Sequence, residues 1–311
     1  MNFYLRKLIS LIITLLCVAV LSFVMFQIIP SDAAITKLGT DATPEQIAAL
    51  RAEYGYDRPL PERFVKWLAG AVRGDFGQSV RYETMSVTEL IGGRLPVTLT
   101  LAVMSILLVV IFAIPLGLIC GRYPGGRLDR ISDAVAVTFM AVPSFVQGIL
   151  VTMLFGIALS AFVPGGYVSM QEDTVGFLRY MFFPALSVAL PKIAMTLRFM
   201  KSSIRKELTS NYVRTARAKG NTTSGVMWRH VFRNTLMPVV TFIGLLVAEV
   251  MAGSIMVEQV FNIPGMGRLL VTSISNRDFN VVAAIVIYIA ATVVTVNMLV
   301  DILYKLIDPR V

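Results

Sequence analysis

The chain has 311 residues, of which 56% are apolar and only 15% are charged, and its formal net charge is +9. A composition this poor in charge excludes an ordinary soluble domain, in which about 25% of residues are charged. A chain of this kind is expected to place its apolar residues in a lipid bilayer.

Six segments are long and apolar enough to cross a bilayer, which takes roughly 20 predominantly apolar residues. In chain order they cover residues 8–29, 97–121, 134–162, 182–200, 236–257 and 281–300. The first follows Arg6 and Lys7, as a signal peptide would, but its apolar core is longer than the usual stretch of roughly 7–15 residues. We therefore predict an all-α, polytopic membrane protein with six transmembrane helices and an uncleaved first span.

Lysine and arginine are concentrated on one side of these spans. Segments 1–7, 122–130, 198–233 and 305–311 carry 2, 3, 9 and 2 of them, whereas the short loops 163–180 and 259–280 carry one and two. Since short cytoplasmic segments are enriched in these residues, both termini are predicted to be cytoplasmic. This topology, with attraction to an anionic inner leaflet, accounts for the positive charge without nucleic acid as a partner.

The sequence predicts three parts along the chain. Residues 1–30 form an N-terminal transmembrane helix, residues 31–95 a small helical insertion on the periplasmic or extracytoplasmic face, and residues 96–311 a core with the other five spans. The core includes a cytoplasmic segment at 201–235. Short helices as rich in charge as those of the insertion do not build a core alone, so we expect the insertion to pack on the membrane part or on a partner.

Capping and turn residues organise the insertion. Thr43-Pro-Glu-Gln46 and Ser86-Val-Thr-Glu89 have the spacing of capping boxes. The first box predicts a helix that Gly55 ends, and a second helix is expected over residues 61–73. One face of that second helix carries Phe64, Trp67, Leu68 and Val72. Gly74-Asp-Phe-Gly77 then breaks the chain.

Two ionisable residues, Lys192 and Glu249, lie deep inside predicted spans. Such residues are costly in a bilayer and are functional candidates by default. At about 1.5 Å per residue their backbones differ in depth by roughly 7 Å, which a lysine side chain can bridge. The two residues either line a transport pathway or form a structural ion pair, and the sequence leaves both readings open.

Five prolines interrupt the spans: Pro115, Pro143, Pro184, Pro191 and Pro238. Each removes a backbone donor, so the helices are expected to bend. A bent bundle suits a transporter that alternates between shapes, and static kinks are the alternative.

The basic stretch 198–233 is the largest segment predicted to be cytoplasmic. Tyr212, Thr215 and Ala216 are expected to share a face of a short helix, and Gly220 to end it. A partner that grips such a helix could move the attached spans as rigid bodies. A basic loop that only obeys the orientation rule is the alternative.

The outer loop at 258–268 mixes turn-forming and apolar residues. Pro264-Gly265 predicts a turn. The apolar residues around it either tuck back between helices as a re-entrant plug or remain in a plain turn.

Several different short motifs that are typical of one protein family are spread along almost the whole chain. They are Thr215-Ala-Arg-Ala-Lys-Gly220, Asp57-Arg-Pro-Leu60 with Trp67-Leu68, Gly74-Asp-Phe-Gly77, Pro143-Ser144, Glu258-Gln-Val-Phe261 with Pro264-Gly-Met-Gly-Arg268, Asn276-Arg-Asp278 and Asp308-Pro-Arg310. Together they make the chain resemble the permease subunits of binding-protein-dependent ABC importers, in particular the peptide and nickel class. The general importer pattern begins Glu-Ala-Ala and ends Leu-Pro, where this chain has Arg214-Thr215-Ala216 and Phe232-Arg233, as the peptide and nickel class usually does.

The resemblance implies a type I ABC importer permease fold in the cytoplasmic (inner) membrane of a bacterium. The implied partners are a second homologous permease subunit, two ABC ATPase subunits, an extracytoplasmic substrate-binding protein and the lipid bilayer. The residues that it assigns to coupling with the ATPase are Tyr212, Arg214, Thr215, Ala216, Arg217, Lys219 and Gly220. It also assigns Phe261, Pro264, Gly265 and Gly267 to a loop that meets the binding protein or forms a gate.

The sequence contains no G-x-x-x-x-G-K-[ST] phosphate loop. This chain is therefore expected not to bind ATP through the usual phosphate loop, and the resemblance implies that ATP and Mg²⁺ are used by the partner ATPases. The chain is expected to have no cofactor, metal site or catalytic residue of its own. The predicted function is ATP-driven import of dipeptides to oligopeptides. Import of nickel or a metal chelate is the alternative within the family, and a stand-alone secondary transporter or channel, or an intramembrane enzyme, is the alternative outside it.

Overall fold

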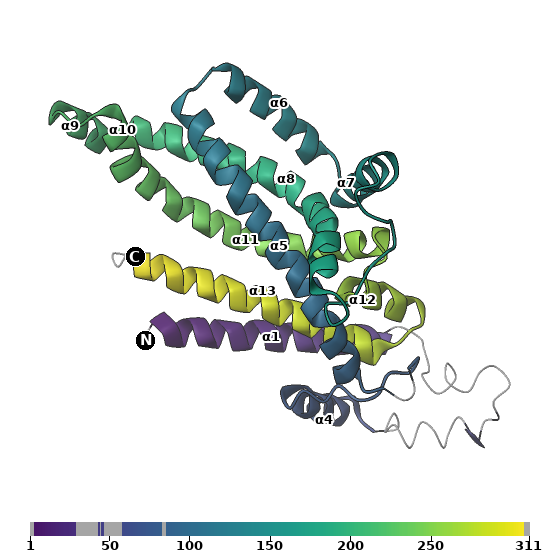
Figure 1. Ribbon diagram of the computed structural model, residues 1–311. Helices are drawn as coiled ribbons and strands as arrows, with labels where there is room; N and C mark the ends of the chain where they lie inside the picture. The colour runs from purple at the N-terminus through teal and green to yellow at the C-terminus, as the bar shows by residue number, and fades with distance from the viewer. Residues whose placement is uncertain (1–2, 29–42, 44, 47–57, 83–84, 308–311) are drawn as a thin grey trace. The chain divides into compact units, whose positions relative to one another are not determined.

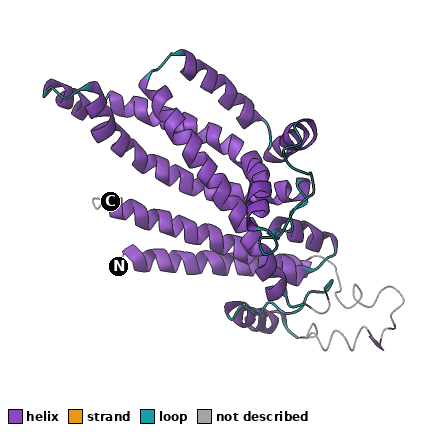
Figure 2. Cartoon of the chain, in the orientation of Figure 1, coloured by secondary structure: helices purple, strands orange, loops and turns teal. Residues whose placement is uncertain are grey.

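The computed structural model describes residues 3–28, 43, 45–46, 58–82 and 85–307, and most of this described chain is helical (Figure 1, Figure 2). The long helices are α1 (Phe3–Ile28), α5 (Val87–Arg122), α8 (Thr174–Leu208), α11 (Phe232–Val260) and α13 (Phe279–Ile307). The shorter elements are α4 (Leu60–Val72), α6 (Arg127–Ala141), α7 (Ser144–Val151), α9 (Asn211–Ala218), α10 (Thr223–Val226), α12 (Met266–Ser275) and the π-helical segments η1 (Thr152–Ala158) and η2 (Met227–Val231). The predicted all-α class is confirmed.

Five helices of the described chain are long and apolar enough to span a membrane. They are α1, α5, α8, α13 and the continuous stretch Thr223–Val260, which contains α10, η2 and α11. The segment predicted as the third span, 134–162, is instead a pair of helical arms, Arg127–Ala141 and Ser144–Ala158, which are bent by 106°. The predicted six spans are reached when this bent pair is counted as one crossing.

The bend between α6 and α7 follows from Pro143. A residue before proline is driven out of the helical region, and Val142 is extended, with φ −98° and ψ 125°. The break frees backbone carbonyls, and the side-chain amide of Gln147 donates to two of them, the carbonyl oxygens of Phe139 at 2.7 Å and Val142 at 2.9 Å. The buried Gln147 side chain therefore replaces backbone hydrogen bonds that the bend removes.

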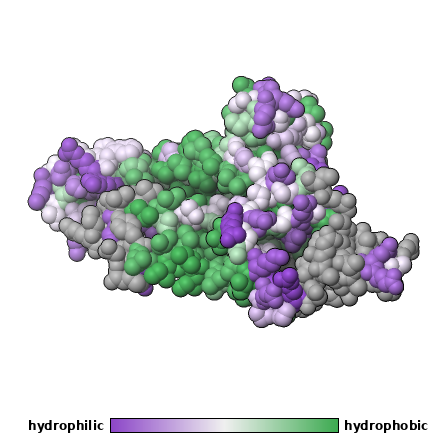
Figure 3. All heavy atoms as spheres, turned by 90° about the horizontal axis from the view of Figure 1, so that it is seen from below, coloured by the Kyte–Doolittle hydropathy of each residue, from purple (hydrophilic) through white to green (hydrophobic). Residues whose placement is uncertain are grey.

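Apolar side chains cover much of the described surface. In α1, for example, Leu21 is 63% exposed and Met25 62% exposed. Figure 3 shows extensive hydrophobic surface on the face that it draws. Such side chains suit a lipid environment, in which exposure of apolar groups carries no hydrophobic penalty.

The chain forms two compact units. The first comprises Met1–Val97 and Pro264–Thr295, and the second comprises Thr98–Ile263 and Val296–Val311. This grouping by contacts is not sequential, because α5 and α13 each contribute to both units. The three parts predicted along the chain remain a prediction.

The first unit has an apolar core built from segments that are far apart in the sequence. Its buried members come from the start of α5 and the segment before it, from α12 and from the first half of α13: Phe76, Val87, Leu90, Ile91, Met266, Leu269, Val281, Ala284 and Ile285. Asp278 is fully buried beside this core. Its carboxylate accepts hydrogen bonds from the hydroxyl of Ser79 and from the backbone N–H of Arg81.

Several local predictions within the first unit are confirmed. Both capping boxes form: Gln46 N–H donates to the Thr43 hydroxyl oxygen at 3.3 Å, and Ser86 N–H donates to the Glu89 carboxylate at 2.9 Å. The reciprocal bonds of the two boxes are also present. The chain breaks at the predicted glycines, Gly74 and Gly77, which have φ of 79° and 80°.

Helix α4 matches the predicted helix at 61–73, and it packs on the membrane part as expected. The rings of Phe64 and Trp67 lie 5.3 Å and 5.8 Å from the ring of Phe23 in α1. Val72 departs from the predicted apolar face, because it is 81% exposed. Three sequence features, the helix end at Gly55, the motif residue Asp57 and the motif at 308–310, lie outside the described residues.

Helix α8 is the centre of the second unit, since α6, α7 and α11 all pack against it. Its half near the predicted cytoplasmic end also meets α5 closely at Gly117 and Gly121. A Cβ atom on Gly117 would lie 2.6 Å from the Met200 Cγ atom, and one on Gly121 would lie 2.9 Å from the Ile204 Cβ atom. The four-residue spacing of the two glycines lets the backbones of α5 and α8 approach.

Candidate functional site

The predicted coupling segment forms the short helix α9, Asn211–Ala218. It begins after the extended residue Ser210, and the turn that terminates it contains Gly220, whose φ of 79° only glycine adopts without strain. Gly220 N–H donates to Arg217 O at 2.9 Å, and Asn221 N–H donates to Ala216 O at 3.2 Å. The predicted helix end at Gly220 is confirmed.

One face of α9 is fixed to the body of the second unit. Val213 and Ala216 are buried, and they pack in one cluster with Met200 and Ile204 of α8 and with Val231 of η2. The three residues expected to share one face differ in burial, since Tyr212 is half-buried, Thr215 is exposed and Ala216 is buried. Ala216 points into the protein, because its three-residue spacing from Val213 places both on the inner face.

The other face of α9 and the turn after it are exposed. Arg214, Thr215, Arg217, Lys219 and Gly220 all lie at the surface. Three of these residues are cationic, and a Cβ atom added to Gly220 would meet nothing within 4 Å. The exposed face is therefore a small basic surface that ends at Gly220, which has no side chain. Such a surface suits an acidic or polar groove on another protein.

Tyr212 lies between the two faces and ties α9 to the end of α8. Its hydroxyl donates to the Glu207 carboxylate at 2.5 Å. Partial burial, followed by this hydrogen bond to an anion, raises the pKa of Tyr212 above 10.0. The phenol therefore remains protonated at neutral pH and holds α9 against α8.

The structure brings Lys192 of α8 and Glu249 of α11 together as an ion pair. The two side chains differ in exposure: that of Lys192 is 12% exposed, and that of Glu249 is 50% exposed. The carboxylate is thus the accessible member, and the ammonium group lies behind it. The pairing agrees with the reach expected from sequence, whereas a role in a pathway remains a prediction.

The predicted gate loop is largely buried. Phe261 is 2% exposed, and its carbonyl accepts a hydrogen bond from the Tyr180 hydroxyl at 2.6 Å. Pro264 is half-buried, and Gly265 and Gly267 are buried. Pro264 and Gly265 connect to α12, which starts at Met266, so the predicted turn is present and runs directly into a helix. A role as a gate or docking loop remains a prediction.

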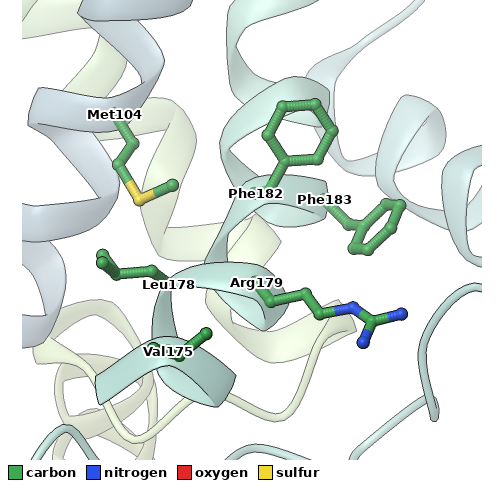
Figure 4. A pocket seen from close by; sticks show the side chains of 6 residues that line it. All are labelled: Met104, Val175, Leu178, Arg179, Phe182 and Phe183. Carbon is green, nitrogen blue, oxygen red and sulfur yellow. The ribbon is translucent and has the colours of Figure 1, made fainter.

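A pocket of about 430 Å³ lies between α5 and the first turns of α8. Its lining residues are Met104, Val175, Leu178, Arg179, Phe182 and Phe183. Figure 4 shows the Arg179 side chain extending away from Met104 and Leu178, so the space between those two is apolar. None of the predicted site residues lines this pocket.

A cluster of charges that was not predicted from the sequence joins α6 to α8. Lys201 and Asp129 form a buried ion pair, and Arg205 also binds the Asp129 carboxylate, at 2.7 Å. An acidic residue in the otherwise basic segment 122–130 was the available signal. The pairing, between residues 72 positions apart, could not be predicted because Lys201 lies in a basic stretch, where a single lysine is not conspicuous.

Comparisons with known proteins show which family the sequence resembles. A family model for the inner membrane component of binding-protein-dependent transport systems matches residues 113–311, and a model for the N-terminal part of such membrane components matches residues 1–102. The chain is similar to a glutathione transport system permease protein of Pectobacterium atrosepticum, with 37% identity over 100% of this chain and 99% of the relative. It is also 33% identical to a probable peptide ABC transporter permease protein of Sinorhizobium fredii, over 99% and 98% of the two chains, and 32% identical to an oligopeptide transport system permease protein of Bacillus subtilis, over 99% and 98%.

Proposed function

Because this chain belongs to the family of inner membrane components of binding-protein-dependent transport systems, and is thus a permease subunit of an ABC importer, we propose that it carries dipeptides to oligopeptides across the cytoplasmic membrane. The names of its relatives, which are peptide and glutathione permeases, favour peptides over nickel or a metal chelate. The chain is a transport component of the inner membrane.

The proposed assembly contains this chain, a second homologous permease, two ATPase subunits and an extracytoplasmic substrate-binding protein. ATP and Mg²⁺ are used by the ATPase subunits. Both termini and α9 lie in the cytoplasm, in keeping with the nine Lys and Arg residues of segment 198–233.

The observation that carries the proposal is the two-faced construction of α9. Its inner face is packed into the chain's own core through Val213 and Ala216, and its outer face is basic and open. A groove on an ATPase that holds Arg214, Arg217 and Lys219 would pass its movement on to α8, because α9 and α8 share one buried apolar cluster. Closure of the ATPases on ATP then turns the permeases between inward- and outward-facing shapes.

A Gly220→Trp variant tests the coupling role. The indole would occupy the open space at the end of α9 and keep the ATPase groove at a distance. Uptake of a labelled peptide into proteoliposomes should fall about tenfold or more, which corresponds to a loss of about 1.4 kcal/mol of coupling. ATP hydrolysis by the assembled complex, measured in parallel, should continue.

Gly165→Trp is the matched control, because Gly165 has a similar φ of 75°, also has open space around it and lies in the loop 163–180, which is predicted to be extracytoplasmic. It carries the same backbone strain and the same added bulk. Equal loss of uptake in both variants, or undiminished uptake in Gly220→Trp, would refute the role of α9.

We further propose that Glu249 lines the pathway, where its exposed carboxylate can meet the amino terminus of a peptide, while Lys192 holds it in place. Glu249→Gln should assemble normally and alter uptake. The double variant Glu249→Gln, Lys192→Met removes both charges and distinguishes a role in the pathway from a purely structural ion pair. A purely structural pair can be replaced by neutral groups at little cost. Recovery of normal uptake in the double variant would show that the pair only fixes packing.

A further inference from the structure

Helix α6 has little apolar anchorage. Of its fifteen residues only Asp129 and Ala136 are buried, while large apolar side chains such as Leu128 and Ile131 are exposed. Its main packing partner is α8. Burial of one alanine contributes little, so the attachment of α6 to α8 depends on the charges between them.

The Lys201 ammonium group of α8 is surrounded by acceptors from α6. It pairs with the Asp129 carboxylate and, at 2.8 Å, with that of Asp133. It also donates to the Ser132 hydroxyl at 3.2 Å and to the Asp129 carbonyl at 3.3 Å. Its side chain is only 3% exposed, so this lysine reaches into α6 instead of into water.

The Asp129 carboxylate gathers three separate parts of the second unit. Besides Lys201 it accepts from Arg205, one turn further along α8, at 2.7 Å. It also accepts from the backbone N–H of Gly125, in the short loop between α5 and α6, at 2.8 Å (Figure 1). The ionic clamp, defined as Asp129, Asp133, Lys201 and Arg205, thus fixes the start of α6 to α8 and to the end of α5.

The same stretch of α8 holds α9. Met200 and Ile204, the neighbours of Lys201 and Arg205 in the chain, belong to the same buried apolar cluster as Val213 of α9. The clamp and the coupling helix are therefore attached to one short, well-packed segment of α8. A displacement of α9 reaches the clamp through this segment without a flexible joint.

We propose that Lys201 is a positioning residue that passes the movement of α9 and α8 to α6, and through α6 to the bend before α7. The inference rests on the proposed function of α9. In this arrangement α6 and α8 move as one body when ATP binds, and the bent pair α6–α7 changes its position with them. Loss of the clamp interactions would allow ATP hydrolysis to continue, but α6 would no longer move together with α8.

The experiment uses the complete complex in proteoliposomes, with peptide uptake and ATP hydrolysis measured on the same sample. Lys201→Gln should lower the amount of peptide taken up per ATP by about tenfold, within the range typical of coupling between sites. Lys201→Arg keeps the charge and should retain the ratio. Lys206→Gln, the same change at an exposed lysine of α8, should leave it unaltered.

A distance measurement tests the joint movement directly. Spin labels are placed at two exposed positions, Ile131 on α6 and Ser202 on α8, in a chain whose two cysteines are replaced by serine. In the otherwise unaltered chain the distance should be the same without nucleotide and with a non-hydrolysable ATP analogue. In Lys201→Gln it should differ between the two states.

An unchanged uptake-to-ATP ratio in Lys201→Gln would overturn the proposal, and so would a distance in the otherwise unaltered chain that changes on nucleotide binding. If Lys201→Gln fails to assemble, the distance between the labels in the otherwise unaltered chain still tests whether α6 and α8 move together. Absence of ATP-dependent uptake in the wild-type complex would instead count against the proposed function. In that case the distance between the two labels still tests the role of the clamp.

Discussion

The close approach of α5 and α8 gives a sharp stability prediction at Gly117. A Cβ atom there would lie 2.6 Å from the Met200 Cγ atom and 2.7 Å from the Met200 Cβ atom. Carbon atoms ordinarily pack at about 3.5–4.0 Å, so the two helices must separate by roughly 1 Å. Because the Met200 Cβ atom is fixed to the backbone, no change of rotamer relieves this contact.

The expected cost of Gly117→Ala is that of overpacking, about 1–3 kcal/mol. Removal of a glycine from a helix returns about 1 kcal/mol, which would hide part of the loss. Gly93→Ala in the same helix corrects for this gain, since a Cβ atom on Gly93 meets nothing within 4 Å. The difference between the two variants isolates the packing term.

Thermal unfolding of the purified protein in detergent measures that difference. Gly93→Ala should unfold at or above the wild-type temperature, and Gly117→Ala should unfold roughly 2–12 °C below Gly93→Ala, at about 2–4 °C per kcal/mol. Met200→Ala should lessen the loss when it is combined with Gly117→Ala, because it removes the Cγ atom. Equal unfolding temperatures for the two single variants would refute the close contact between α5 and α8.

Three further predictions concern single hydrogen-bonding groups. Asp278→Asn weakens the charged acceptor of the Ser79 hydroxyl and should destabilise the protein by about 1.5–3 kcal/mol in thermal unfolding; an unchanged unfolding temperature would contradict the buried network. Gln147→Leu removes the donor to two carbonyls at the bend and should cost about 1–3 kcal/mol, whereas the same change at the exposed Gln171 should cost little. The raised pKa of Tyr212 means that its contribution to stability is complete below pH 10.0 and is lost as pH rises through the higher pKa of the folded state. The difference in stability between wild type and Tyr212→Phe should therefore be constant from pH 7 to pH 9 and shrink above pH 10, and a difference that does not change across this alkaline range would contradict the hydrogen bond to Glu207.

Features that depend on a few neighbouring residues could be predicted from the sequence. The capping boxes at Thr43 and Ser86 and the helix end at Gly220 are decided within three or four residues, and all three are present. Five of the six predicted spans are also local features, since each depends on the length of one apolar run.

Features that depend on packing between distant segments could be predicted only in part. The position of Ala216 was misjudged because a single short helix has several small or apolar residues, and the core of α8 decides which of them face inward. Pro143 signalled a bend, but its angle of 106° depends on both arms and on Gln147. The Lys201–Asp129 pair was missed, whereas Lys192–Glu249 was found, because a lone charge inside an apolar run is conspicuous and a lysine in a basic stretch is not.

The hydrogen bond between Ser79 and Asp278 affects the order in which the protein folds during its synthesis. The two residues are 199 positions apart, and the core beside them needs α12 and α13 as much as the start of α5. At about 5–20 residues per second, a ribosome completes Asp278 roughly 10–40 s after Ser79. During that interval the early segments have been made without their final partners, so the core of the first unit can form only after α12 and the first half of α13 have been synthesised.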